Sequence, residues 1–182
     1  MIRLFEGVDF SGLVSEVENN TTLFDQFTVR QSFDGSPHKQ TKSIPLRTNY
    51  SDGIELADLV NEKEANETPF MEHFPLCYEF IMELGHHLKS ERLGSALLVM
   101  LFPNSKIEPH EDHGEYYQYY DRVHICLTGA CHLREGSQYG SMKSGDVWVI
   151  DNRKEHEVWN DRDTSRIHLI VDYRLKHGIY TG

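Results

Sequence analysis

Apolar residues recur at steps of three and four between Glu72 and Leu88, the spacing of one face of an α-helix. The residues on this face are Phe74, Cys77, Phe80, Ile81, Leu84 and Leu88. This pattern predicts an amphipathic helix. A second, shorter helix is expected over Phe10–Val17, where Asp9 can cap the first turn.

After Gly94 the pattern changes to short β-rich runs separated by Gly, Pro, Asn and Asp residues. The predicted strands are Ala96–Phe102, Arg122–Leu127, Cys131–Glu135, Val147–Ile150, Glu157–Asn160 and Arg166–Asp172. Several short strands at this spacing are typical of an antiparallel sandwich or barrel. We therefore predict an α+β fold, mainly β, with the N-terminal helices packed outside a β-sandwich core.

The chain has 182 residues, which favours a single domain. Residues 1–95 are mixed in character and would support the core and shape a substrate pocket, whereas residues 96–175 would form the β core. The polar and acidic stretch from Asn49 to Thr68 predicts a loop. We find no internal repeat.

Charge and apolar content restrict the possible partners. The 29 acidic residues outnumber the 18 basic ones, giving a formal net charge of −11, which disfavours binding to a nucleic-acid backbone. The longest apolar run, Ala96–Phe102, is far shorter than the ~20 residues of a membrane span. No secretory signal pattern is visible, and the three cysteines are expected to be reduced thiols in the cytoplasm, with a Cys126–Cys131 link left open.

The candidate chemistry begins at His110-Glu111-Asp112. On an extended chain, residues two apart face the same side, so His110 and Asp112 can converge on one point. One more histidine would complete the two-histidine, one-carboxylate triad of non-haem Fe(II) oxygenases. The spacing alone is weak, since His113 and Glu115 share it, and a zinc site on His110 and His113 is an alternative that would require a helix.

Four motifs between Leu98 and Tyr173 strengthen this interpretation: Pro109-His110, Arg122-Val123-His124, Gly145-Asp146-Val147 and Glu155-His156-Glu157-Val158-Trp159. Together they resemble the aspartyl/asparaginyl β-hydroxylase family of Fe(II)- and 2-oxoglutarate-dependent oxygenases. The resemblance implies a double-stranded β-helix (jelly-roll, cupin-like) fold. It also implies Fe(II) as cofactor, and 2-oxoglutarate with O2 as co-substrates.

The resemblance also implies roles for individual residues. His110, Asp112 and His156 match the iron ligands, and Arg166 and His124 match residues that contact 2-oxoglutarate. A guanidinium fork suits a carboxylate because it binds both oxygens and stays charged when buried. Arg122 matches an arginine that holds a substrate carboxylate. Val99 stands where animal members carry a serine that binds the co-substrate, which is a departure from the family pattern.

Each assignment has a plainer alternative. His156 could be a surface histidine at a strand end, Arg166 an exposed strand residue near Asp161 and Asp163, and His124 a core histidine.

Two further substrate-contact candidates lie outside these motifs. The tyrosine-rich segment Glu115–Tyr120, with Tyr117 as a substrate contact, could be a lid over the pocket or an aromatic hairpin packed on itself. Arg47, in a segment similar to the N-terminal strand of bacterial amino-acid hydroxylases, could be a second substrate anchor or a surface arginine.

The function expected from these observations is hydroxylation of an unactivated C–H bond in an amino acid or an amino-acid-containing substrate, free or peptidyl, that bears a carboxylate. Two alternatives stay open: a non-redox, cupin-like binding or isomerase module, and a metal-dependent dioxygenase that does not use 2-oxoglutarate. The sequence does not choose the substrate or the oligomeric state.

Overall fold

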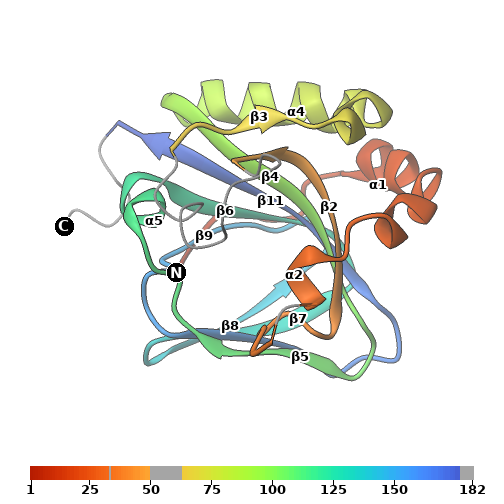
Figure 1. Ribbon diagram of the computed structural model, residues 1–182, viewed down its shortest axis with the longest axis vertical. Coiled ribbons are helices and arrows are strands. Elements are labelled where there is room, and N and C mark those ends of the chain that lie inside the picture. Colours follow the sequence, from red (N-terminus) through yellow and green to blue (C-terminus); the bar gives the residue numbers. More distant parts are fainter. Residues whose placement is uncertain (33, 50–62, 177–182) are drawn as a thin grey trace.

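A computed structural model describes residues 1–32, 34–49 and 63–176 of the chain. Two antiparallel sheets lie one above the other, and helices cover the outer side of the larger sheet (Figure 1). The helical elements are α1 (Ser11–Glu18), the 3-10 helix η1 (Thr21–Asp25), α2 (Val29–Ser32), the 3-10 helix η2 (Pro69–His73), α4 (Pro75–His87) and α5 (Glu115–Tyr119). The strands are β1 (Ile2–Phe5), β2 (Thr41–Thr48), β3 (Asn66–Glu67), β4 (Ser90–Leu101), β5 (Ser105–His110), β6 (Asp121–Thr128), β7 (Ala130–Glu135), β8 (Gln138–Lys143), β9 (Val147–Ile150), β10 (His156–Asn160) and β11 (Arg166–Leu175).

The strand order identifies the fold. The larger sheet runs β1-β9-β6-β11-β4-β2-β3 and the smaller one β5-β10-β7-β8. If β4 to β11 are counted from one to eight, the core of the two sheets has the orders 1-8-3-6 and 2-7-4-5, which is the arrangement of a jelly roll. The predicted double-stranded β-helix with helices outside is confirmed, and β1, β2 and β3 from the N-terminal half extend its larger sheet.

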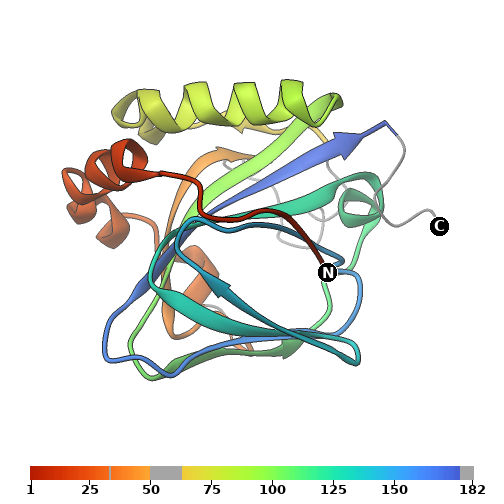
Figure 2. The ribbon, with the colours of Figure 1, turned by 180° about the vertical axis from the view of Figure 1, so that it is seen from behind.

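Strand β11 shows why this sheet has two different faces. Ile167, Leu169, Val171 and Tyr173 alternate with Arg166, His168, Ile170 and Asp172, as the two-residue period of a strand requires. The first set joins the apolar core beneath α1 and α4, which cover this face in the view from behind (Figure 2). The second set faces the smaller sheet, so polar and charged side chains enter the interior of the sandwich.

The space between the sheets also holds an apolar cluster. It consists of Leu101, Ile107, Cys126, Cys131, Leu133, Met142, Ile150 and Val158. Leu101 and Cys126 of this cluster pair with Arg166 and His168 of β11, so the polar set of β11 lies directly beside it.

Several local expectations are corrected. The helix predicted from Glu72 begins at Pro75, because the preceding turn is the 3-10 helix η2, and α1 begins at Ser11 with Phe10 rather than Asp9 at its N-cap. The tyrosine-rich segment is the helix α5, not a hairpin. Within the described residues all three cysteines are free, so no Cys126–Cys131 link is present.

The six predicted β-rich runs omit β1, β2, β3, β5 and β8, although the resemblance at Arg47 suggested a strand in the segment of β2. β8 lies at the edge of its sheet, as does β5, and most of their side chains are polar or exposed, so neither shows the apolar signal of a buried strand. β2 contains Pro45, which lowers its strand propensity. Of the loop predicted over Asn49–Thr68, residues 50–62 lie outside the described residues.

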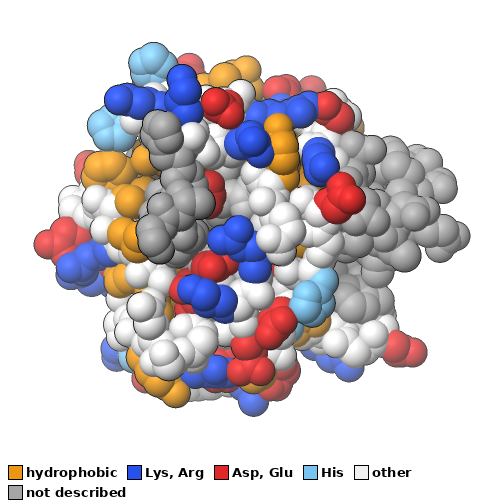
Figure 3. Space-filling view, turned by 90° about the vertical axis from the view of Figure 1, so that its left-hand side faces the viewer, with side chains coloured by type: hydrophobic (Ala, Val, Ile, Leu, Met, Phe, Trp, Pro, Cys, Tyr) orange, Lys and Arg blue, Asp and Glu red, His pale blue; other side chains and the backbone are white. Residues whose placement is uncertain are grey.

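The surface does not gather its charge into one patch on the face shown in Figure 3, where acidic and basic side chains are interspersed. Among the helices in the described part of the chain, none is long and apolar enough to cross a membrane.

Candidate metal centre

Two histidines face each other on neighbouring strands of the smaller sheet. His110 is the last residue of β5, His156 is the first of β10, and the antiparallel register pairs them directly. Their ring centroids are 4.2 Å apart. The pairing depends on strand register and therefore joins residues that are distant in sequence. His156 is only 5% exposed, so it is not the surface histidine of the plainer alternative.

Both imidazoles are oriented in the same way. The Nδ1 of His110 lies 2.7 Å from the carbonyl of Glu108, and the Nδ1 of His156 lies 3.0 Å from the carbonyl of Lys154. A carbonyl only accepts, so each Nδ1 donates, and in a neutral imidazole held this way the Nε2 keeps its lone pair. Such a backbone contact is the usual way in which a protein presents a histidine to a metal ion.

Asp112 supplies the third ligand, and its two oxygens have different surroundings. Oδ2 accepts from Arg122 Nη1 at 2.7 Å and from Asn152 Nδ2 at 2.8 Å. Oδ1 lies 3.8 Å from His110 Nε2. The Asp112 backbone N–H also donates to the carbonyl of Asn152 at 2.9 Å, which fixes the turn after β5. Oδ1 is therefore the oxygen turned toward the histidines.

One ligand atom from each of His110, Asp112 and His156 lies within 4.8 Å of the others. Burial lowers the pKa of His156, with the Asp112 charge opposing it, so the imidazole is in the neutral form that binds metal. Burial alone would raise the pKa of Asp112, but Arg122 and the histidines lower it. The donor set fits a divalent transition metal with open coordination positions, as in non-haem iron sites.

Arg122 connects this triad to the strands behind it. Its Nε and Nη2 donate to Oδ1 and Oδ2 of Asp172 at 2.8 and 2.9 Å, and β6 and β11 hold the two residues in register. Tyr116 donates to the same Asp172 at 2.9 Å and accepts from the Ser95 N–H at 2.8 Å. Burial alone would lower the pKa of Arg122, yet the two carboxylates raise it well above its ordinary value.

The Arg122 guanidinium is thus used within the protein: it bridges Asp112 and Asp172. Its predicted role at a substrate carboxylate stays a prediction, and the structure shows it as a support for the carboxylate ligand. Tyr117 of α5 covers the same guanidinium, with its ring centroid 5.4 Å from Arg122 Cζ. Burial and the charge of Asp112 raise the pKa of Tyr117. Tyr117 therefore stays close to the triad as a neutral phenol.

A second polar group lies inside the sandwich. His124 and His168 are buried with their Nδ1 atoms 3.3 Å apart, and burial, followed by the charge of Arg166, lowers the pKa of each well below the usual range. Arg166 is only 1% exposed, which excludes the exposed-strand alternative for this residue. Its Nη1 donates to the Val99 carbonyl at 3.4 Å, while its buried Nε and Nη2 have no partner among the described residues.

Ser43 was not anticipated from the sequence. It pairs with Val99 across β2 and β4, and Val99 pairs with His168 across β4 and β11, so all three share the inner face. The Ser43 hydroxyl is buried and has no partner within the described chain. A buried serine hydroxyl is thus present on the strand next to Val99. Its only signal in the sequence was a lone serine.

Arg47 has partners at all three guanidinium nitrogens. It donates to the carbonyls of Gly94 and Ala65 at 3.3 and 2.6 Å and contacts Glu67 at 3.1 Å. These contacts attach β2 to β3 and β4. Its predicted role as a substrate anchor stays a prediction.

The segment that links α2 to β2 lies at the level between the two sheets (Figures 1 and 2). Its His38 ring packs edge-on against His110, with centroids 5.1 Å apart. Arg30 reaches His38 from α2, with Nη2 3.1 Å from Nε2. The sequence did not single out Arg30 or His38 as site residues, because only the folding of the chain brings them close to the triad.

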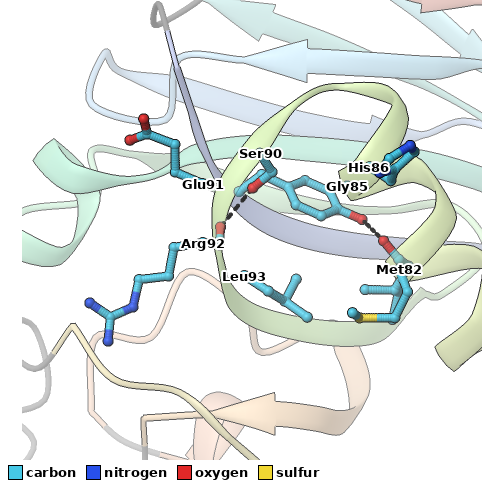
Figure 4. A pocket seen from close by; sticks show the side chains of 9 residues that line it. Met82, Gly85, His86, Ser90, Glu91, Arg92 and Leu93 are labelled. Carbon is cyan, nitrogen blue, oxygen red and sulfur yellow. Dashed lines mark hydrogen bonds between the residues drawn. The ribbon is translucent and has the colours of Figure 1, made fainter.

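A surface depression of about 300 Å³ lies elsewhere, between α4 and the start of β4 (Figure 4). Its lining includes Met82, His86 and Leu93 but none of the triad, and Ser90 Oγ donates to the Arg92 carbonyl at its edge. It is therefore separate from the candidate metal centre.

Comparisons with known proteins agree with this geometry. Residues 27–175 match the family model described as Aspartyl/Asparaginyl beta-hydroxylase. The L-proline cis-4-hydroxylase of Rhizobium meliloti is 25% identical over 125 residues, which cover 66% of this chain and 44% of that protein. The chain therefore spans less than half the length of this relative.

Solved structures with similar folds include a cupin 2 conserved barrel protein from Salinispora arenicola, at 19% identity and a TM-score of 0.36, covering 43% of this chain and 61% of that one. Another is described as a predicted oxalate decarboxylase from Thermotoga maritima, at 20% identity and a TM-score of 0.39, covering 51% and 73%. The fold assignment rests on the strand order given above rather than on these two likenesses.

Proposed function

Since the chain belongs to the aspartyl/asparaginyl β-hydroxylase family, we propose that it is an Fe(II)- and 2-oxoglutarate-dependent hydroxylase acting on a small, carboxylate-bearing substrate such as an amino acid. The observation that carries the proposal is the convergence of His110, Asp112 and His156 within 4.8 Å. The orientation of each ligand supports it, because both Nδ1 atoms and Oδ2 form hydrogen bonds within the protein, while Oδ1 is turned toward His110 Nε2, 3.8 Å away.

The buried polar groups support a place for 2-oxoglutarate. The Nε and Nη2 atoms of Arg166 are buried without a partner in the described structure, a costly arrangement for a cation unless an anion binds there. The unpartnered Ser43 hydroxyl lies on the same inner face. We assign the distal carboxylate of 2-oxoglutarate to Arg166, with Ser43 as an additional donor.

When bound, Fe(II) and 2-oxoglutarate would activate O2 and couple the release of succinate and CO2 to hydroxylation of the substrate. The residues of this chain would position and protect the reacting groups. Arg122 and Asn152 hold Oδ2 of Asp112 so that Oδ1 faces the two histidines. His124 and His168 remain neutral beside Arg166, so they place no second positive charge next to its guanidinium. The apolar cluster between the sheets keeps water away from this side of the site.

The substrate class is supported by the L-proline cis-4-hydroxylase relative, whose name specifies a free amino acid. We therefore place small amino acids ahead of peptides as candidate substrates. Because the match covers only 44% of that relative, the proposal names a class of substrate and not one compound.

The test is binding and turnover with matched variants. Under anaerobic conditions, Fe(II) with 2-oxoglutarate should give a weak visible charge-transfer band, and in air the complex should release succinate. His110→Ala and His156→Ala should abolish both. His113→Ala is the matched control, because its side chain is 79% exposed in the same loop. Full succinate release by either triad variant would contradict the proposal.

The same experiment separates the alternatives. A non-redox binding or isomerase module would show neither the band nor succinate. A dioxygenase that does not use 2-oxoglutarate would be unaffected by Arg166→Met, whereas the proposal expects the KM for 2-oxoglutarate to rise about 10- to 100-fold, the effect of losing a hydrogen bond to a charged group.

A further inference from the structure

Arg30 is a cation at the edge of the triad without a counter-charge. Its Nη2 contacts only the ring of His38, at 3.1 and 3.4 Å, and its Nη1 is buried without a hydrogen-bond partner in the described chain. No carboxylate among the described residues forms an ion pair with it. Burial and the neighbouring charge of Arg122 lower the pKa of Arg30 to about 10, so it remains a cation at neutral pH.

The surroundings of Arg30 point toward the reaction site. Its pKa responds to Asp112, Tyr117 and Arg166 as well as to Arg122, and all four belong to the site described above. His38 joins Arg30 to the metal ligand, since the His38 ring packs against His110 with centroids 5.1 Å apart. An anion bound at Arg30 would consequently lie beside the metal centre.

The other two arginines of the site already have an assigned partner or ligand. Arg122 directs Nε, Nη1 and Nη2 to Asp172 and Asp112, which leaves it no open fork for an external carboxylate. Arg166 has two nitrogens without a partner in the described chain, but it lies inside the sandwich, and we have assigned it to 2-oxoglutarate. Arg30 is therefore the unsatisfied guanidinium at the wall of the site formed by α2 and His38.

We propose that Arg30 binds the carboxylate of the substrate, and that the substrate is a molecule with a free carboxylate, held next to the metal through the Arg30–His38–His110 contacts. This inference rests on the proposed function. It moves the substrate-binding role from Arg122 to Arg30. The reason is electrostatic: a guanidinium with an open N–H edge gains charge-assisted hydrogen bonds from a carboxylate, whereas one that already bridges two carboxylates does not.

The local backbone holds Arg30 in place. The Ser36 hydroxyl donates to the Arg30 carbonyl and accepts from the His38 N–H, so one side chain connects the two residues. The carbonyl of Pro37 accepts from the Glu108 N–H at 3.3 Å, which attaches this segment to β5. Arg30 is thus positioned by the strand that ends in His110.

The experiment compares wild type with Arg30→Met and Arg30→Lys, using Arg162→Met as the matched control, because the Arg162 side chain is 63% exposed on the turn after β10. The probes are the twenty L-amino acids, short peptides with free C-termini, and the C-terminal amide of each. One readout is succinate release. The other is the shift in the unfolding temperature of the metal-free protein caused by each probe.

We expect at least one carboxylate probe to stimulate the wild type and raise its unfolding temperature, and its amide to do neither. Arg30→Met should raise the KM for that probe about 10- to 100-fold, remove the temperature shift and abolish discrimination against the amide. Arg30→Lys should recover part of each effect, and Arg162→Met should behave as wild type.

Three outcomes would overturn the inference: an unchanged KM in Arg30→Met, equal stimulation by acid and amide in the wild type, or no stimulation by any carboxylate probe. The charge-transfer band with Fe(II) and 2-oxoglutarate does not need Arg30. Its presence in Arg30→Met would show that the variant is folded and that the proposed function stands even where the Arg30 inference fails.

Discussion

Arg122 Nη1 lies 2.7 Å from Asp112 Oδ2, so the carboxylate that completes the candidate metal triad, in the turn after β5 of the smaller sheet, is held by a partly buried arginine from β6 of the larger sheet. The same guanidinium contacts Asp172. This relationship makes the metal site depend on an ion-pair network that extends to β11.

Replacing Arg122 should affect both stability and metal binding. Arg122→Gln leaves Asp112 and Asp172 without their counter-charge. Because the side chains of Arg122 and Asp112 are 14% and 13% exposed, the loss of unfolding free energy should lie below the about 3–5 kcal/mol of a fully buried pair. Loss of a residue that orients a ligand should weaken Fe(II) binding about 10- to 100-fold. Urea denaturation and calorimetric titration would measure the two effects. Arg3→Gln, whose side chain is 43% exposed, should change neither; equal effects in both variants would argue against a specific role for Arg122.

Gly94 allows Tyr116 to approach the network. A Cβ at this position would lie 2.7 Å from the Tyr116 hydroxyl and 3.1 Å from the Asp172 carbonyl. Gly94→Ala should therefore displace Tyr116 and destabilise the fold by about 1–3 kcal/mol, as overpacking does. Gly12→Ala is the control, because its Cβ would meet only Leu76 at 3.8 Å and alanine favours a helix. A neutral Gly94→Ala in denaturant unfolding would show that the contact relaxes without cost.

Acid should destabilise the protein through its buried histidines. The pKa values of His124 and His168 are well below normal in the folded state, mainly because of burial, whereas in the unfolded chain they return to about 6.5. Their contribution to stability is complete above about pH 6.5 and is lost as the pH falls toward the folded pKa values, because only the unfolded state takes up the protons.

His168→Gln should reduce the slope of unfolding free energy between about pH 6.5 and 5 by about 1.4 kcal/mol per pH unit, which corresponds to one proton. The slope is obtained from denaturant titrations at several pH values. His113→Gln is the control substitution, because the His113 side chain is 79% exposed. An unaltered slope in His168→Gln would contradict the burial argument.

A divalent metal should stabilise the folded protein by an amount that grows with the logarithm of its concentration relative to Kd. At a metal concentration about 100 times Kd the gain is about 2.7 kcal/mol, which for a chain of this size raises the unfolding temperature by roughly 5–10 °C. Thermal scans with Fe(II) under anaerobic conditions, followed by chelation, would measure this. Asp112→Asn should lose most of the increase. An equal increase in that variant would place the metal elsewhere.

The sequence by itself determined the elements whose signal is local. The apolar period between Glu72 and Leu88 predicted α4, and the β-rich runs after Gly94 predicted six of the core strands. These predictions were possible because residues close together in the sequence form each face of a helix or strand. His110 and Asp112 could be proposed from their two-residue spacing. His156 and Arg166 could be assigned only through the family resemblance.

Tertiary structure decided which groups meet. The pairing of His110 with His156, the use of Arg122 by Asp112 and Asp172, and the open edges of Arg30 and Arg166 all depend on strand register and on contacts between distant segments. A sequence pattern gives the period of a strand but not the strand that pairs with it. Whether a charged side chain has an ion-pair or hydrogen-bond partner is known only when the residues around it are in place. For that reason the chain pattern could propose the metal ligands, while only the fold showed that Arg122 pairs with Asp112 and Asp172 and that Arg30 and Arg166 keep unpartnered nitrogens within the described residues.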